Sequence, residues 1–456
     1  MRGLNVSPVG RIPDKSEIQI YLASEYINIF QIGIWGRNKN TAVKLKELSI
    51  YIHIPFCKSR CNYCSFYSLP ISEPFPAPAK TIQSAAKKSL KFNPSYFELY
   101  DSFIIKEAGL ISEEFSLEGS RINSIYFGGG TPSVMPADFF RNILENVERN
   151  FEIADNAEIT VEINPESGSF AKLSDLKPLG INRLSIGAQS FNGGVLKTAG
   201  RIHDEKDIYN SVNNARRAGF NNISLDLIIG LPGQTENIFY DDARRISDAG
   251  TEHISAYMLG IEKGMKFYEI YNKKKGSGFI SEENTAEYYE ILCGLLAENS
   301  YARYEISNFA KDGYESRHNL NYWKRGEYLG FGPSASSFLK LGSGKEIRKT
   351  NTADLKKYIQ NISKKFHCEG NDNKGIEQNN GDFIEILTDK DKINEEIFLS
   401  LRTASGINAK RLSELTGREI IDKFIKEGFM QNSKENIILT LKGALLSSEI
   451  FARIMI

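Results

Sequence analysis

Short apolar runs and amphipathic stretches alternate along the middle of the chain. Stretches such as 136–151, 205–218 and 237–249 have helical spacing, and six apolar runs between turn residues have the character of strands buried on both faces. The predicted strands are Leu48–Ile54, Ser124–Phe127, Glu158–Ile163, Arg183–Ile186, Ile223–Ile229 and His253–Met258. This order predicts an α/β fold of six β-then-α units, arranged as an open or incomplete barrel. A doubly wound open sheet is the alternative.

The pattern divides the chain into four parts. We expect an N-terminal extension of unknown structure at 1–46, a partial (β/α)6 barrel at 47–300, and a mixed region at 301–391. Residues 392–456 have three helical stretches and one short strand, which is typical of a winged-helix-like domain. Because this last part has no basic stripe, we interpret it as a packing or interaction module and not as a DNA reader. A proline-rich insertion near 69–95 has no predicted role.

Composition limits the partners of the chain. With 57 basic and 57 acidic residues the formal charge is zero, which favours neither nucleic acid nor an anionic membrane surface. No stretch reaches the roughly 18 to 20 apolar residues of a membrane span. The chain has 5 cysteines, and those that cluster have metal-ligand spacing, which suggests a reducing compartment. We therefore expect a cytoplasmic protein without a membrane span.

Three cysteines follow the first predicted strand directly. Cys57, Cys61 and Cys64 form a C-x3-C-x2-C run, and thiolates at this spacing can hold three corners of a cubane cluster while the fourth iron stays open. A structural zinc site is the alternative, with His53 close enough in the sequence to take part. Such sites usually have four ligands in two separated pairs, whereas Cys293 and Cys368 are distant and isolated.

The other predicted strands also end near groups that could contact a ligand. Gly128-Gly129-Gly130 removes every Cβ, so a ligand could lie against the backbone and use its N–H and C=O groups. An amino-acid group on an open iron would need a carboxylate for its ammonium and a cation for its carboxylate, and Glu162 and Arg201 supply those charges. A single glycine run is usually a flexible turn, and a single carboxylate is usually a cap. Together they predict a site.

These motifs resemble the radical S-adenosylmethionine superfamily, and within it the branch of the oxygen-independent coproporphyrinogen III oxidases and the HemW-type heme chaperones. The resemblance runs from about residue 51 to 456. It is carried by YIHIPFC (51–57), the cysteine triplet, GGGTPS (128–133), RLSIGAQ (183–189), DLIIGLPG (226–233) and YEISNFA (304–310).

The resemblance implies a [4Fe-4S] cluster on the three cysteines, with S-adenosylmethionine on its open iron as the source of a deoxyadenosyl radical. The positions that match the cofactor contacts of the family are Tyr51, Tyr63, Gly129, Gly130, Thr131, Glu162, Gln189, Arg201, Asp226 and Gly260.

Two features separate the chaperones from the oxidases. The oxidases carry a further cysteine two residues after the third cluster ligand, where this chain has Phe66. The run His318-Asn-Leu-Asn-Tyr-Trp323 looks like the HemW-type signature H-N-x-x-Y-W, which is associated with heme. Without the resemblance, a histidine followed by aromatic residues would be interpreted as ordinary packing.

The resemblance therefore favours a heme chaperone that passes heme to acceptor hemoproteins, with His318 as the candidate axial ligand. A second histidine is absent, because the chain has Ala335-Ser336-Ser337 where HemW-type proteins commonly have Ala-His-Ser. The alternative is an oxidase that converts coproporphyrinogen III propionates to vinyl groups. We assign no catalytic residue.

Overall fold

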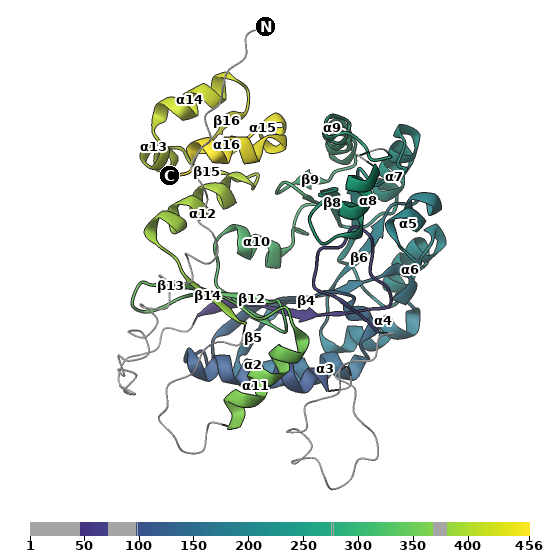
Figure 1. Ribbon diagram of the computed structural model, residues 1–456, viewed down its shortest axis with the longest axis vertical. Helices are drawn as coiled ribbons and strands as arrows, with labels where there is room; N and C mark the ends of the chain where they lie inside the picture. Colours follow the sequence, from purple (N-terminus) through teal and green to yellow (C-terminus); the bar gives the residue numbers. More distant parts are fainter. Residues whose placement is uncertain (1–45, 72–96, 98, 275, 277, 368–380) are drawn as a thin grey trace. The chain divides into compact units, whose positions relative to one another are not determined.

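The computed structural model describes residues 46–71, 97, 99–274, 276, 278–367 and 381–456. A 12-stranded sheet has the order β14-β13-β12-β11-β1-β4-β5-β6-β7-β8-β10-β9 (Figure 1). Its central parallel strands are β1 (Glu47–Ile54), β4 (Arg121–Gly129), β5 (Glu152–Ile163), β6 (Arg183–Gln189), β7 (Ile223–Ile229) and β8 (His253–Met258). These are the six predicted strands, so the partial (β/α)6 barrel is confirmed. Most of the N-terminal extension and of the proline-rich insertion lies outside the described residues.

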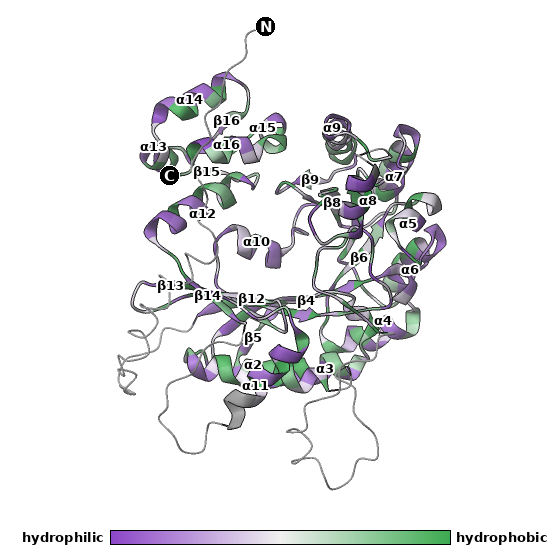
Figure 2. Ribbon diagram, in the orientation of Figure 1, coloured by the Kyte–Doolittle hydropathy of each residue, from purple (hydrophilic) through white to green (hydrophobic). Residues whose placement is uncertain are grey.

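Amphipathic helices follow the strands of the barrel. They are α2 (Tyr100–Glu114), α3 (Ala137–Asn150), α4 (Phe170–Leu176), α5 (Gly193–Ala199), α6 (Glu205–Arg217), α7 (Glu236–Asp248), α8 (Lys266–Lys274) and α9 (Glu282–Glu298). Helix α3 buries Phe140, Ile143 and Val147 at helical spacing, and hydrophobic and hydrophilic positions alternate along it in Figure 2. Helix α6 begins with a capping box between Asp204 and Asp207. Within the described residues, no helix is both long and apolar enough to cross a membrane.

The sheet continues beyond the barrel on both sides. The added strands are β9 (Ala302–Arg303), β10 (Asn308–Ala310), β11 (Tyr328–Phe331), β12 (Ser336–Lys340), β13 (Glu346–Thr350) and β14 (Phe383–Ile386). Strand β11 pairs with β1 in parallel, whereas β10 and β12 to β14 pair antiparallel with their neighbours. Two helices, α10 (Arg317–Trp323) and α11 (Leu355–His367), connect these strands. The region at 301–391 thus extends the barrel sheet.

The two faces of the barrel strands differ in polarity. On β1, the side chains of Ile50, Ile52 and Ile54 are fully buried in the apolar core. The alternate residues Ser49, Tyr51 and His53 point to the other face, because successive side chains in a strand point to opposite sides. A buried face of polar residues is a poor hydrophobic core, so this inner face is where a site is expected.

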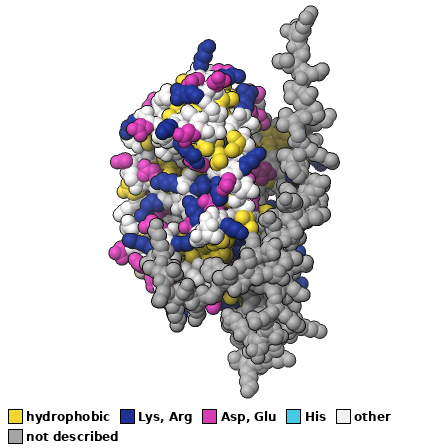
Figure 3. Space-filling view, turned by 90° about the vertical axis from the view of Figure 1, so that its left-hand side faces the viewer, with side chains coloured by type: hydrophobic (Ala, Val, Ile, Leu, Met, Phe, Trp, Pro, Cys, Tyr) yellow, Lys and Arg dark blue, Asp and Glu magenta, His cyan; other side chains and the backbone are white. Residues whose placement is uncertain are grey.

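The C-terminal part has a core of its own. Its elements are α12 (Asp389–Leu401), β15 (Ile407–Asn408), α13 (Ala409–Thr416), α14 (Arg418–Lys426), β16 (Met430–Ser433), β17 (Asn436–Leu439), α15 (Leu441–Leu445) and α16 (Ser447–Ile454). The strands form a small sheet in the order β15-β17-β16, in agreement with the predicted winged-helix-like pattern. Basic and acidic side chains are interspersed on the face drawn in Figure 3.

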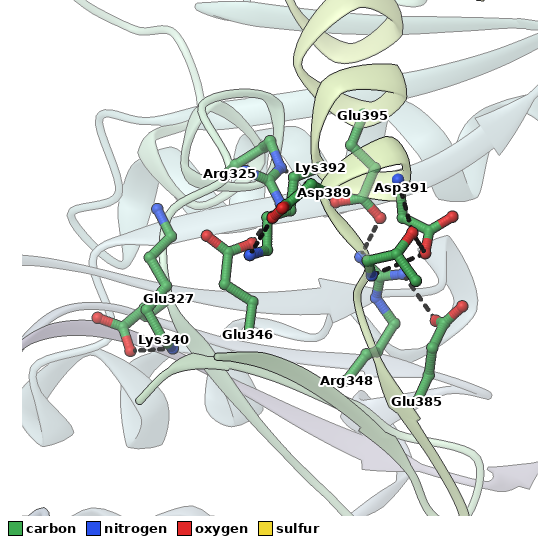
Figure 4. A network of polar contacts seen from close by, with 11 residues as sticks. Arg325, Glu327, Lys340, Glu346, Arg348, Glu385, Asp389, Asp391, Lys392 and Glu395 are labelled. Carbon is green, nitrogen blue, oxygen red and sulfur yellow. Dashed lines mark hydrogen bonds and ion pairs between the residues drawn. The ribbon is translucent and has the colours of Figure 1, made fainter. Parts of the chain in front are cut away.

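A group of ion pairs, the arginine clamp, ties α12 to the extended sheet (Figure 4). Glu395 on α12 accepts from Arg325 Nε at 3.0 Å and from Arg348 Nη2 at 2.6 Å. Arg325 also contacts Glu346 at 2.5 Å, and Arg348 contacts Glu385 at 3.2 Å. Since Arg325 lies just after α10, the clamp also fixes the end of that helix.

Candidate functional site

The cysteine loop leaves β1 and is held between two helices. Cys57 ends the short strand β2 (Phe56–Cys57), which pairs with β3 (Leu69–Pro70) where the loop returns. Asn62 anchors the middle of the loop, since its N–H donates to Ala199 O at 2.9 Å and its carbonyl accepts from Phe267 N at 2.8 Å. The two helices that supply these partners are α5 and α8. The loop is therefore fixed against the barrel by backbone hydrogen bonds.

The three thiols of this loop are free, and Cys57 is only 8% exposed. Burial raises the pKa of the Cys57 thiol, and it raises that of Cys64 to about 11. Among the described residues, no three His, Cys, Asp or Glu side chains are placed as ligands of one metal ion. A cubane needs no such convergence, because each thiolate binds a different iron.

His53 is not free to complete a zinc site. Its Nδ1 lies 3.1 Å from Tyr51 Oη, and its Nε2 lies 2.9 Å from the carbonyl oxygen of Tyr67. Burial lowers the pKa of His53 to about 4, so its ring is neutral at physiological pH. With both ring nitrogens occupied, the thiols fit a cluster better than the zinc alternative.

The glycine run packs the end of β4 against the cysteine strand. Gly129 has φ +112°, and a Cβ there would lie 2.5 Å from the ring of His53. The N–H groups of Gly129, Gly130 and Thr131 donate to Glu162 Oε2, Ile54 O and Phe56 O at 3.1, 2.8 and 2.8 Å. These N–H donors are thus used within the protein, so a ligand lying against this backbone would have to use its C=O groups, and contact of the glycines with a cofactor stays a prediction. The glycines are required because two strands approach closely.

Glu162 is a carboxylate that two hydrogen bonds orient. Its Oε1 accepts from Tyr126 Oη at 3.0 Å and its Oε2 from Gly129 N at 3.1 Å. Burial, with the nearby charge of Asp226 as the second cause, raises the pKa of Glu162 to about 7. A cation beside this carboxylate would stabilise its ionised form, so the residue suits an ammonium group.

Asp226 lies on the neighbouring strand β7. Its carboxylate accepts from Ser185 Oγ at 3.2 Å and from Ser224 Oγ at 3.4 Å. Burial raises the pKa of Asp226, while these hydroxyls and the charge of Arg183 act against the shift. Two acidic groups therefore face the same interior, each oriented by hydroxyl donors.

A hydrogen-bonded chain connects two of the cysteines through Arg201. Its Nη1 lies 3.6 Å from Cys61 Sγ, and its Nη2 donates to Asn164 Oδ1 at 2.9 Å. Asn164 Nδ2 donates to Thr131 Oγ1 at 3.1 Å, and Thr131 Oγ1 donates to Cys57 Sγ at 3.4 Å. Donors to cluster sulfurs tune a cluster and hold its ligands. Sequence reasoning missed Asn164, although an Asn-Pro step directly after the strand of Glu162 marks the position.

The remaining predicted positions differ in how closely they approach the site. Gln189 ends β6 with φ +67°, a conformation that a residue other than glycine rarely adopts, and its amide packs against Gly187. Tyr63 packs in an apolar cluster with Val195 and other residues beside the loop. Gly260 is exposed, and a Cβ there would meet no atom within 4 Å. Its contact with a cofactor stays a prediction.

His318 does not join the cysteines. It lies on α10, is 1% exposed, and its ring stacks on Tyr126 with 5.1 Å between the ring centroids. Its Nδ1 lies 2.9 Å from Ser124 Oγ, and its Nε2 lies 2.9 Å from Tyr322 Oη. In this arrangement neither ring nitrogen is available to an outside ligand.

Comparisons with known proteins identify the family of the chain. The model of the Radical SAM superfamily matches residues 51–246, and that of the HemN C-terminal domain matches residues 387–446. The chain is 33% identical to "Heme chaperone HemW" of Bacillus subtilis, over 88% of this chain and 98% of that protein. It is 31% identical to the protein of the same name from Lactococcus lactis, over 90% of this chain and 98% of that protein.

A solved structure, the coproporphyrinogen III oxidase HemN from Escherichia coli, has a similar fold. The TM-score is 0.68 at 22% sequence identity, and the match covers 90% of each chain. At this identity the likeness concerns the fold alone.

Proposed function

The chain belongs to the radical SAM superfamily and, within it, to the group of the HemW-type proteins, and from this premise we propose that it is a heme chaperone. In this proposal it carries a [4Fe-4S] cluster and S-adenosylmethionine, binds heme, and passes heme to acceptor hemoproteins. The observation that carries the proposal is the extent of the match, which runs over 98% of two relatives named heme chaperones. We place this task in the cytoplasm, where thiols stay reduced.

Phe66 supports the same choice between the two branches. Its side chain is 63% exposed and stands two residues after Cys64, where the oxidases carry another cysteine. The likeness to the coproporphyrinogen oxidase extends to the fold and does not favour that activity.

Three parts of the chain form the mouth of the barrel: the cysteine loop, Gly128–Thr131 and Arg201. Their side chains fit the two cofactors of the superfamily. When bound, these cofactors supply one-electron reductive cleavage of a carbon–sulfur bond. Cys57, Cys61 and Cys64 would hold the cluster, with Thr131 and Arg201 donating to the sulfurs as they do in the structure. Glu162 would bind the ammonium group, and Arg201 brings the positive charge that a carboxylate needs.

Heme is a different case. Coordination of its iron by His318 would require one ring nitrogen to give up its partner, Ser124 or Tyr322, because these residues occupy both nitrogens. The described conformation therefore does not fit His318 as a heme ligand, and we derive no heme geometry from it. The proposal needs α10 to open or another residue to bind the iron.

The test is anaerobic reconstitution of the cluster, followed by titration with heme and then addition of an apo-globin. We expect a heme absorbance band on the protein that moves to the globin over time. Heme that stays on the protein, or no binding at all, would contradict a chaperone. In parallel, coproporphyrinogen III, S-adenosylmethionine and a reductant are added. Repeated turnover to vinyl products would establish the oxidase instead.

A further inference from the structure

Two histidines inside the barrel have the same hydrogen-bond pattern. His318 has a serine hydroxyl at Nδ1 and a tyrosine hydroxyl at Nε2. His253 on β8 repeats this arrangement, with Ser224 Oγ 2.8 Å from Nδ1 and Tyr304 Oη 2.9 Å from Nε2. Both side chains are fully or almost fully buried. Neither histidine is used by the cluster or by the cysteine loop, so their roles need a separate explanation.

Both rings are neutral. Burial lowers the pKa of His318 to about 3 and that of His253 well below its ordinary value, and the charge of Arg183 adds to both shifts. A neutral imidazole has one donor and one acceptor nitrogen, and a serine and a tyrosine satisfy both. Ser124 also donates to Ser49 Oγ at 2.8 Å, so it accepts from His318 and the tautomer is set.

The N-terminus of helix α10, where His318 is the second residue, is held by hydrogen bonds to one carboxylate. Glu158 on β5 accepts from Ser316 Oγ at 3.2 Å and from the N–H groups of Arg317 and His318 at 3.0 Å each. A carboxylate at a helix N-terminus is stabilised both by these donors and by the helix dipole. The ring of His318 therefore has a fixed position against β4.

Tyr126 connects the ring of His318 to the predicted cofactor site. His318 and Tyr126 stack with an interplanar angle of 28°, and the hydroxyl of Tyr126 donates to Glu162 Oε1 at 3.0 Å. His253 reaches the other carboxylate instead, because its partner Ser224 lies 3.4 Å from Asp226 Oδ1. Each histidine thus supports one of the two acidic groups that face the interior.

We propose that His318 is a positioning residue of the S-adenosylmethionine site, which holds the Tyr126 ring so that its hydroxyl keeps Glu162 oriented. The inference rests on the cofactor part of the proposed function and is independent of heme transfer.

The test measures S-adenosylmethionine affinity of the cluster-loaded full chain by equilibrium dialysis. His318→Gln keeps two polar atoms and loses the ring, and we expect about tenfold weaker binding, as for a contact that couples two residues. Tyr126→Phe should weaken binding by a similar factor. Because both changes interrupt the same path from His318 through Tyr126 to Glu162, the double variant should bind at most about twofold more weakly than the more impaired of the two single variants.

His253→Gln is the matched control, since it removes the same kind of ring on the side of Asp226. Its effect should multiply with that of Tyr126→Phe. Multiplied effects of His318→Gln and Tyr126→Phe, or an affinity of His318→Gln within twofold of the unchanged chain, would overturn the proposal. A spectroscopic readout is the electron paramagnetic resonance signal of the reduced cluster, which S-adenosylmethionine should perturb only at correspondingly higher concentration.

If circular dichroism shows that His318→Gln does not fold, two further variants test the proposal. Ser124→Ala and Tyr322→Phe each remove one partner of the ring and leave the imidazole in place, and each should weaken cofactor binding severalfold; unchanged affinity in both would overturn the proposal. Heme titration of the same variants separates the two roles. Lost heme with unchanged cofactor affinity would reject positioning and support ligation, whereas weaker cofactor binding with retained heme would support positioning and remove His318 as the ligand.

Discussion

The polar groups at the mouth of the barrel and those at its floor differ in their hydrogen-bond partners. At the mouth, defined by the cysteine loop, Gly128–Thr131 and Arg201, Cys57 Sγ and Cys61 Sγ accept from Thr131 and Arg201 at 3.4 and 3.6 Å, ordinary distances for a sulfur acceptor, and all three thiols are free. At the floor, defined by His253, His318 and their serine and tyrosine partners, every ring nitrogen has a partner within 2.9 Å.

This difference separates a place for ligands from a place for support. A sulfur that must bind a metal has to keep a bonding position that the protein does not fill, while buried groups without a ligand must be fully paired, since an unpaired buried polar group costs about 1–3 kcal/mol.

Loss of a cluster ligand should have the largest effect. Cys57→Ala, Cys61→Ala or Cys64→Ala leaves too few thiolates at the mouth, and we expect the reconstituted protein to lose its broad visible absorbance and its bound iron. Cys293→Ala is the control, because this free cysteine lies on α9 outside the loop. A cluster retained in any of the three loop variants would refute the ligand assignment.

Gly129→Ala tests how tightly the mouth is built on β1. The added Cβ would meet the His53 ring at 2.5 Å and would occupy a left-handed backbone conformation. We expect a loss of about 3 kcal/mol in the free energy of unfolding from overpacking and strain together. Chemical denaturation of the cluster-free protein measures this loss. Gly260→Ala is the control, and it should hardly change the free energy of unfolding because a Cβ at Gly260 has open space around it. Equal stability of the two variants would contradict the close approach of β4 and β1.

The pH dependence of cofactor binding tests Glu162. Its pKa is raised to about 7 by burial and Asp226, so the carboxyl is protonated below that pH and ionised above it. Binding an ammonium group requires the ionised form, and the affinity should therefore fall about tenfold for each pH unit below 7 and level off above it. Glu162→Gln should bind weakly at every pH. A flat profile for the unchanged chain would remove Glu162 as the partner of the ammonium.

The arginine clamp should give the smallest effect and tests how far the floor depends on the C-terminal part. Glu395 and Arg325 are each about one-seventh exposed, at 14% and 15%. Glu395→Gln should lower the free energy of unfolding by about 1–2 kcal/mol, less in high salt. Its neighbour Glu396, which pairs with Arg411 at 33% and 44% exposure, is the matched control, and Glu396→Gln should cost at most about 0.5 kcal/mol. Equal losses would indicate that the clamp is an ordinary surface pair.

Sequence patterns predicted the strands of the barrel because each is a short apolar run between turn residues. The predicted bounds of Ile223–Ile229 and His253–Met258 agree with β7 and β8. Strand β11 was not predicted, because its four residues include Gly330 and carry little periodicity, and its pairing with β1 is long-range. Helices α15 and α16 were also missed, since they are 5 and 8 residues long and only Leu446 separates them, which interrupts the helical period.

For the site, the spacing of the cysteines and the strand-end residues could be predicted, while their supports could not. Asn164 and Tyr126 act through contacts between strands, and a single sequence does not give those distances. The burial of His318 follows from the position of α10 against β4, which depends on Glu158 from a strand far away in the chain. The motif is visible in the sequence, but whether it faces outward or inward is a tertiary property.

The pairing of β11 with β1 has a consequence for how the chain is made. Strand β1 pairs with β4 on one edge and with β11 on the other, and Ser49 lies opposite Tyr328 in that second ladder. During synthesis the cysteine loop therefore leaves the ribosome long before β11, the second neighbour of the strand β1 that carries the loop. Any nascent or truncated chain that ends before Tyr328 leaves one edge of β1 open, and an open strand edge invites pairing with other chains. Maturation of the metal centre on a stable base thus waits for residues late in the sequence.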